Sequence, residues 1–146
     1  MKAALLEAVP GQLVIVDDVE HDAVGPREVL IRTSAAGVCH SDLHFMEGKF
    51  RTRTPTVIGH EASGVVLEVG RDVTFVKPGA HVVTCLSVFC GTCEFCLSGQ
   101  LVLCSKRGTR RGRGEPQRLR RQGTDIHQFL DVSAFAERML VHENAV

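Results

Sequence analysis

Four cysteines near the middle of the chain constrain its folding more than any other feature, because their spacing is C-x2-C-x2-C-x7-C. They are Cys90, Cys93, Cys96 and Cys104. Two intervening residues allow neighbouring thiolates to reach a single metal ion from one tight turn. Four sulfurs with no open coordination position are typical of a structural zinc site. We therefore predict a zinc-binding lobe over residues 86–105.

Two other interpretations of this cluster are weaker. Four buried thiols without a common ligand would not need this spacing. Iron–sulfur clusters are bound by cysteines with a similar spacing. In those proteins a proline usually follows the last cysteine, whereas here Ser105 follows Cys104. The lobe has few apolar residues of its own, so zinc should supply much of its folding free energy, on the order of 10 kcal/mol. Chelation is therefore expected to unfold residues 86–105 first.

The rest of the sequence consists mainly of short apolar segments separated by glycine and proline. The expected strands cover residues 3–8, 13–16, 28–35, 61–69, 80–85 and 134–141, with short helices after Ser41 and over residues 92–98. Strands of this length with frequent turns favour a mainly β fold, either a partly open β-barrel or a sandwich. Cys85, in the fifth of these strands, is expected to be a core residue.

Composition excludes several classes of protein. Hydrophobic residues make up 44% of the 146 residues and charged residues 23%, unlike a disordered chain. Apolar runs stay well short of the ~20 residues of a membrane span, and Glu7 interrupts the N-terminus too early for a signal peptide. A cytoplasmic protein is expected, and in that compartment cysteines more often bind metals than form disulfides.

The seventeen basic and seventeen acidic residues are unevenly distributed. Residues 107–121 contain seven arginines and one acid, Glu115. Residues 106–123 have almost no apolar side chain except Leu119, so we expect an exposed Arg-rich loop. Its favoured interpretation is a solvated insertion, although its charge is also suited to attracting an anionic substrate or cofactor. A nucleic-acid-binding module is a further alternative, disfavoured because no aromatic side chains interleave with the arginines.

A second group of metal-binding residue types lies earlier in the chain. Cys39 is found in Gly-Val-Cys-His-Ser-Asp (residues 37–42), and His60 and Glu61 in Gly-His-Glu-Ala-Ser-Gly (residues 59–64). A single cysteine or histidine is a weak signal. Together, a thiolate and an imidazole flanked by carboxylates have the composition of an incomplete zinc site. Asp42 is a candidate for orienting His60 from outside the ligand shell.

Ser41 and His44 lie within five residues of Cys39 and are able to transfer protons. The alternative is structural: Ser41 caps a helix that begins at Asp42, and His44 faces solvent. From the residues alone both interpretations stay open.

These motifs together resemble the zinc-dependent medium-chain alcohol dehydrogenases. The run Gly59-His60-Glu61-x2-Gly64-x5-Gly70-x2-Val73 is similar to the zinc signature of that family, and residues 37–42 to the segment carrying its first catalytic-zinc ligand. The cysteine cluster resembles its structural-zinc lobe, and residues 128–130 and 133–137 the strand that closes the same domain. The resemblance spans nearly all 146 residues and is closest to the bacterial class III-like and aryl-alcohol branch. It implies a GroES-like, partly open β-barrel over residues 1–146.

The resemblance also implies roles for single residues. Cys39 and His60 correspond to two protein ligands of the catalytic zinc, and Glu61 to a nearby acid that approaches the metal during ligand exchange. Asp42 corresponds to the acid that holds the histidine ligand.

A proton relay and a cofactor contact are implied as well. Ser41 corresponds to the hydroxyl that takes the proton of the substrate alcohol, and His44 to the outer end of that relay. His40 corresponds to a position that faces the pyrophosphate of NAD(P). The implied substrate is a small alcohol or aldehyde, and the implied full-length enzyme is a homo-oligomer.

Three parts of such an enzyme are expected to lie outside these residues. The third protein ligand of the catalytic zinc would follow Val146, and residues 112–117 do not form the G-x-G-x-x-G pattern of a Rossmann domain. In relatives a segment after that domain returns to complete the catalytic unit. We therefore expect an N-terminal fragment that is inactive alone. A resemblance to a co-chaperonin barrel is disfavoured, because metal ligands have no use there.

Overall fold

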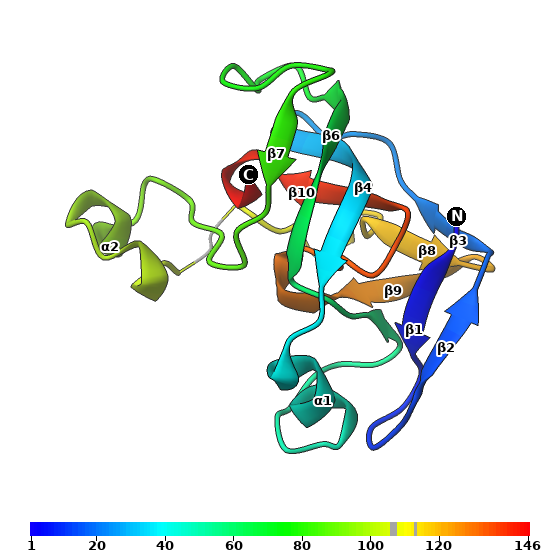
Figure 1. Cartoon of the computed structure of the whole chain (residues 1–146). Coiled ribbons are helices and arrows are strands. Elements are labelled where there is room, and N and C mark those ends of the chain that lie inside the picture. Colours follow the sequence, from blue (N-terminus) through cyan, green and yellow to red (C-terminus); the bar gives the residue numbers. More distant parts are fainter. Residues whose placement is uncertain (106–107, 113) are drawn as a thin grey trace.

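The computed structural model describes residues 1–105, 108–112 and 114–146. Lys106, Arg107 and Arg113 of the predicted Arg-rich loop lie outside the described residues. The described part forms two β-sheets with short helices beside them (Figure 1). The strands are β1 Ala3–Leu6, β2 Leu13–Val16, β3 Val19–His21, β4 Glu28–Gly37, β5 Thr56–Val57, β6 Glu61–Val69, β7 His81–Val83, β8 Leu119–Arg121, β9 Thr124–Gln128 and β10 Arg138–His142. The helices are α1 His40–Met46, α2 Glu94–Leu97 and the 3-10 turns η1 Leu101–Leu103, η2 Phe129–Asp131 and η3 Glu143–Ala145.

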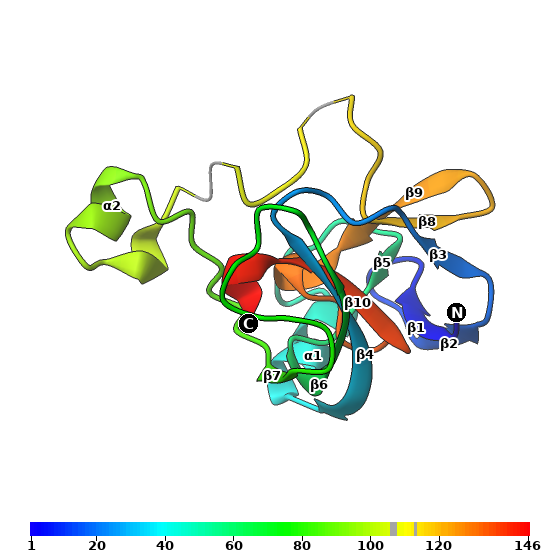
Figure 2. The same ribbon diagram turned by 90° about the horizontal axis from the view of Figure 1, so that it is seen from above.

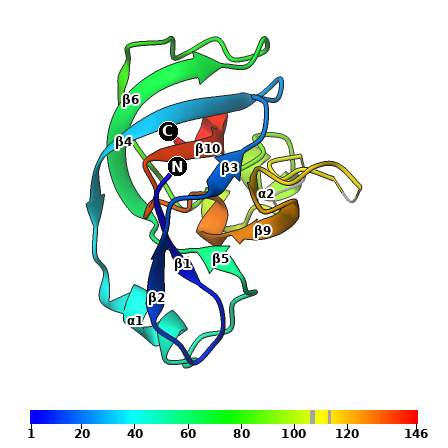
Figure 3. The same cartoon turned by 90° about the vertical axis from the view of Figure 1, so that its right-hand side faces the viewer.

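The two sheets curl into a half-barrel. One has six strands in the order β2-β1-β5-β9-β8-β3, and the other has four in the order β10-β4-β6-β7. The long strands β4 and β6 curve together (Figure 3), with register shifts after Leu30 and Thr33. Such irregularities bend a strand and increase its twist. The mainly β architecture confirms the predicted partly open barrel.

The core consists of three groups of buried apolar side chains. The first packs against the four-stranded sheet and includes Ile31 and Val66. The second packs against the six-stranded sheet and includes Leu5. The third contains Leu6, Ile58 and Phe129, and Phe45 of α1 packs against it. This third group ties α1 to the turn that follows β9, and the candidate site lies beside it.

The expectation of an exposed loop over residues 106–123 is wrong for its last part. Leu119 begins β8 and is only 2% exposed, and β8 pairs with β9 through a hairpin whose turn residues, Gln122 and Gly123, both have positive φ. The hairpin is seen at the right of Figure 2. Leu119 and Ile126 are its buried apolar residues, so the strand pairing is stabilised by the rest of the sheet rather than by an apolar sequence pattern.

The expectation that Cys85 is a core residue is also wrong, because its side chain is exposed. β7 is the edge strand of the four-stranded sheet. Alternation places Val82 against the core, while Val83 and Cys85 face away from it. The last predicted strand likewise begins later than expected, at Arg138.

The segment around α2 and η1 stands apart from both sheets (Figure 1). Its apolar side chains are largely exposed, with Leu97 76% and Val102 78% exposed. Packing therefore contributes little to its stability, in line with the predicted dependence on a metal. None of the helices in the described ranges has the length and hydropathy needed to cross a bilayer.

Candidate metal centres

Cys39 is positioned by the start of α1, which follows directly from β4. Cys39 is the N-cap residue of the helix, and its backbone N–H donates to Asp42 Oδ2 at 3.0 Å. In return the Cys39 side chain accepts from the backbone of Asp42, which completes a capping box. The helix starts at His40, so the structural interpretation in which Ser41 is the cap is wrong. The cap frees Ser41 for other contacts.

His60 is held from the opposite side of the site. It is 5% exposed, and its Nδ1 lies 3.2 Å from Oδ1 of Asp42, which is itself 3% exposed. The same carboxylate therefore touches both the Cys39 backbone and the His60 ring. With Nδ1 facing an acid, Nε2 is the nitrogen left to act as a ligand. Asp42 occupies the orienting position predicted from the sequence.

The two segments converge on one point. Ser41 Oγ lies 3.1 Å from Cys39 Sγ and 3.3 Å from His60 Nε2, and Glu61 Oε1 lies 3.9 Å from the same nitrogen. The ligand atoms of Cys39, His60 and Glu61 all lie within 4.8 Å of one another. A soft thiolate, an imidazole and a carboxylate at this spacing fit one zinc ion, with Ser41 beside it.

The two remaining predicted residues lie at the outer side of α1. His40 is exposed and half-buried His44 stacks edge-on against it, with the ring centroids 4.5 Å apart. His44 also contacts Phe50 at 5.2 Å. The structure thus brings Ser41 and Asp42 together with the candidate ligands, and it groups His40 with His44 next to them.

The four-cysteine cluster is compact. Sulfur–sulfur distances are 3.9 Å for Cys90 and Cys96, 3.5 Å for Cys93 and Cys96, and 3.8 Å for Cys93 and Cys104. Four sulfurs at about 2.3 Å from a tetrahedral ion lie about 3.8 Å apart. The four sulfurs lie within 4.8 Å of one another, and none of the six cysteines is joined in a disulfide. The cluster therefore fits zinc.

Backbone groups in the lobe prepare some of these thiols for metal binding. The backbone N–H groups of Cys96 and Ser105 lower the pKa of the Cys93 thiol to about 5, so that it is a thiolate at neutral pH. The backbone and hydroxyl of Thr92 lower the pKa of Cys90. Burial instead raises the pKa of Cys96 to about 11. Zinc binding would therefore release a proton from Cys96.

Sequence reasoning missed the roles of several charged residues. Arg118 is 6% exposed and donates to Glu28 at 2.7 Å, and Arg111 donates to both oxygens of Glu28 at 3.0 and 2.6 Å. Burial alone would raise the pKa of Glu28, but these two arginines outweigh it and lower the pKa to about 2. Arg110 pairs with buried Asp131. Much of the predicted Arg-rich loop therefore holds the fold together instead of lying free in solvent.

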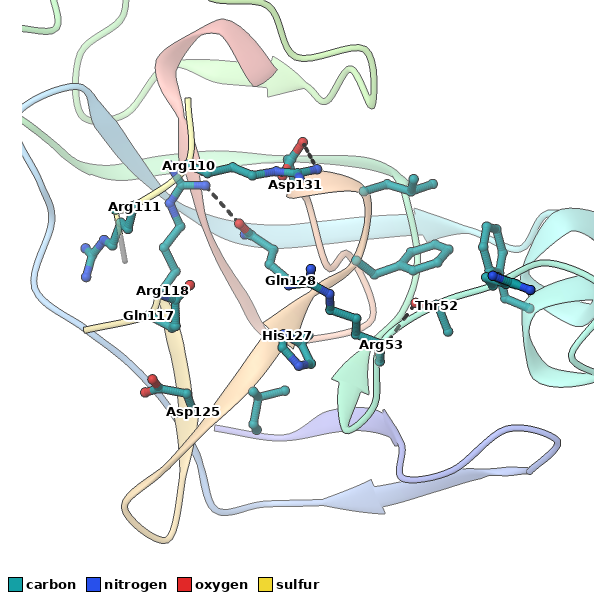
Figure 4. A pocket seen from close by; sticks show the side chains of 16 residues that line it. Thr52, Arg53, Arg110, Arg111, Gln117, Arg118, Asp125, His127, Gln128 and Asp131 are labelled. Carbon is teal, nitrogen blue, oxygen red and sulfur yellow. Dashed lines mark hydrogen bonds and ion pairs between the residues drawn. The ribbon is translucent and has the colours of Figure 1, made fainter. Parts of the chain in front are cut away.

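A cavity of about 870 Å³ opens between the segment after α1 and the turn after β9 (Figure 4). Arg51 and Arg53, which the motifs did not single out, line it together with Arg110, Arg111 and Arg118. The sequence feature that could have pointed to these two residues is their spacing of two, close to the metal-ligand motifs.

The chain is similar to a known protein family over most of its length. The family described as "Alcohol dehydrogenase GroES-like domain" matches residues 25–146. The NDMA-dependent alcohol dehydrogenase of Amycolatopsis methanolica is 40% identical over 148 residues, covering 99% of this chain and 40% of that relative. The chain spans about two fifths of the length of the curated relatives it matches.

Two solved structures share the fold. An alcohol dehydrogenase zinc-binding domain protein from Burkholderia ambifaria is 32% identical with a TM-score of 0.85, covering 99% of this chain and 40% of that one. The benzyl alcohol dehydrogenase of Acinetobacter calcoaceticus is 29% identical with a TM-score of 0.85, covering 99% and 39%. By its sequence, its fold and the arrangement of its candidate ligands, this chain belongs to the alcohol dehydrogenase GroES-like domain family.

Proposed function

We propose that this chain is the metal-binding, substrate-activating part of a zinc- and NAD(P)-dependent alcohol dehydrogenase. The observation that carries the proposal is the position of Ser41 Oγ, 3.1 Å from Cys39 Sγ and 3.3 Å from His60 Nε2. A hydroxyl that adjoins two candidate ligands is placed to take a proton from an alcohol bound there. When bound, zinc with an open position supplies Lewis-acid activation of an alcohol or carbonyl oxygen.

Each residue has a defined task in this proposal. Cys39, His60 and Glu61 hold the catalytic metal, and Asp42 fixes the ring of His60. Ser41 accepts the proton of the substrate hydroxyl, and His44 passes it on towards solvent. His40, exposed next to His44, contacts the pyrophosphate of the cofactor.

The other expectations belong to the longer enzyme. Residues 1–146 act as one domain with a structural-zinc lobe at 86–105 and the Arg-rich segment at 106–123. The cofactor is NAD(P), the substrate a small alcohol or aldehyde, and the assembly a homo-oligomer. Six cysteines without a disulfide support a reducing, cytoplasmic location. The nucleic-acid alternative lacks support, because Arg110, Arg111 and Arg118 are engaged by acids of the same chain.

Cobalt titration of the purified chain tests this function. We expect one tightly bound metal in the lobe, lost in Cys93→Ser, and a second, weaker Co²⁺ equivalent with thiolate charge-transfer absorbance. Cys39→Ser and His60→Ala should abolish the second signal, and an added alcohol should shift it in the wild-type chain. His81→Ala, which removes an exposed histidine of β7, is the matched control. A second signal that survives Cys39→Ser, or two equally tight equivalents, would contradict the assignment.

A further inference from the structure

The arginine-lined cavity carries more positive charge than its own acids neutralise. Five arginines and two aspartates line it. Both aspartates already have partners: Asp131 is ion-paired with Arg110, and Asp125 lies 3.5 Å from Arg120. Both carboxylates that line the cavity are therefore engaged in ion pairs. An arginine of the cavity that has no acidic partner remains available to a ligand.

Arg51 and Arg53 are such residues. Both are exposed, and no carboxylate among the described residues lies within ion-pair distance of either. In Figure 4 the Arg53 side chain points into the cavity, towards His127 and Gln128. The opposite wall is rigid, because Arg118 donates to Gln128 Oε1 at 2.9 Å while Gln128 Nε2 donates to Leu140 O at 2.7 Å.

The cavity lies close to the candidate catalytic metal site, although Cys39, Ser41 and His60 are not among the residues that line it. Phe45 and Phe129 line it, and their rings meet edge-on with centroids 4.7 Å apart. The Phe129 ring lies 5.9 Å from the ring of His60. One wall of the cavity is therefore apolar, and its Phe129 ring adjoins His60.

We propose that Arg51 and Arg53 bind the anionic end of the substrate, a carboxylate or a phosphate, while its hydroxyl end lies beside Cys39 and His60. This inference rests on the proposed function. Guanidinium groups match the planar geometry of carboxylates and phosphates. Unpaired charges in a cavity with low-dielectric walls also raise the local concentration of an oppositely charged ligand. The preferred substrates are hydroxy acids or phosphorylated alcohols rather than neutral alcohols.

Calorimetric titration of the metal-loaded chain at low ionic strength tests the anion site with hydroxyhexanoate, hexanediol and inorganic phosphate. Hydroxyhexanoate should bind about five-fold more tightly than hexanediol, since exposed ion pairs each contribute modestly. Arg51→Gln/Arg53→Gln should remove this preference, whereas Arg71→Gln, which alters an exposed arginine outside the cavity, should keep it. The tighter of phosphate and hydroxyhexanoate identifies the preferred anion. Equal affinities for hydroxyhexanoate and hexanediol, or an equal loss in Arg71→Gln, would overturn the proposal.

A Cys39→Ser chain separates this proposal from the proposed function. If only the metal assignment fails, phosphate will still bind in an Arg53-dependent manner, and Cys39→Ser will leave hydroxyhexanoate affinity unchanged. If only the anion site fails, alcohols will still shift the cobalt absorbance, and the carboxylate will add no affinity.

Discussion

Two constraints meet at the backbone of Gly59, the residue before the candidate ligand His60. Its φ is +92°, and a Cβ placed there would lie 2.5 Å from Cδ1 of Phe135. Phe135 has little room to withdraw, because its backbone N–H donates to Ile58 O at 2.9 Å, and Ala134 donates to Gly59 O at 2.9 Å. An L-residue at positive φ costs about 1–2 kcal/mol before any clash is added. The glycine therefore fixes where His60 enters the site.

Gly59→Ala is expected to lower the free energy of unfolding by about 3 kcal/mol, from backbone strain together with overlap on Phe135. Gly123→Ala is the matched control, because Gly123 has φ +77° but open space where the Cβ would be. We expect Gly123→Ala to lower the free energy of unfolding by about 1 kcal/mol. Urea unfolding of both variants measures the difference, and equal losses would show that the contact with Phe135 is unimportant.

At the candidate site, the sequence predicts the residues that belong to local motifs. Cys39 and Asp42 are joined by a helix cap that their spacing of three allows, and Gly59-His60-Glu61 forms a recognisable motif. The exposed arginines of the cavity belong to no such motif. Arg53 reaches the cavity only because the segment after α1 folds back against β9, a long-range arrangement that its neighbours in sequence do not determine.

At the scale of single elements, the zinc lobe depends on its ligands for its shape. Cys93 is the N-cap of α2, Cys96 lies within α2, and Cys104 is the C-cap of η1. These helical segments have four and three residues, far below the ~12 at which an isolated helix becomes marginally stable. The sulfur cluster is the feature that joins them.

Removing zinc with a chelator is expected to raise amide exchange first within residues 86–105, before β4 and β6 lose protection. Hydrogen exchange followed by mass spectrometry measures this order. Cys104→Ser should give the same pattern without a chelator, whereas Cys85→Ser, which alters the exposed cysteine outside the cluster, should leave the lobe protected. Unchanged exchange at Glu94–Leu97 after zinc removal would rule out metal-dependent folding of the lobe.

The strands differ in how well local sequence predicts them. β1, β2, β4 and β6 are apolar enough to be predicted directly, and each lies within an expected segment or overlaps one. β8 reads Leu-Arg-Arg and β9 reads Thr-Asp-Ile-His-Gln, with one buried apolar residue in each. Their pairing depends on β3 and β5, which flank them in the sheet. Tertiary context therefore decides these strands, and pattern analysis misses them.

At the scale of the whole molecule, a buried charge network joins the Arg-rich segment to the body. Glu28 begins β4, pairs with Arg111 and Arg118, and lies next to buried His142 at the end of β10. Removing one partner of such a network costs about 3–5 kcal/mol, because the remaining charges stay buried. Within the described part of the segment, Arg110, Arg111, Arg118, Arg120 and Arg121 each have an acidic partner, so the charges of these residues are paired inside the chain.

This network makes stability depend on pH in a defined direction. Burial, followed by the charges of Arg27 and Arg118, lowers the pKa of His142 from its ordinary 6.5 to about 4. Between these values the unfolded chain binds a proton at this residue and the folded chain does not, so acidification favours unfolding. The pKa of Glu28 is lowered from 4.5 to about 2, so the free energy of unfolding falls further below pH 4.5. At neutral pH neither His142 nor Glu28 reduces the stability in this way.

We therefore expect the free energy of unfolding to fall by about 3 kcal/mol between pH 6.5 and 4 because of His142 alone. Urea unfolding across this range should show a shallower slope in His142→Gln, since that side chain does not titrate. His81→Gln, which removes an exposed histidine, should keep the wild-type slope. Protonation of zinc-bound thiols affects the wild type and both variants alike. The difference in slope between the wild type and His142→Gln therefore gives the contribution of His142. Parallel slopes in His142→Gln and the wild type would mean that His142 is not held neutral by the buried network.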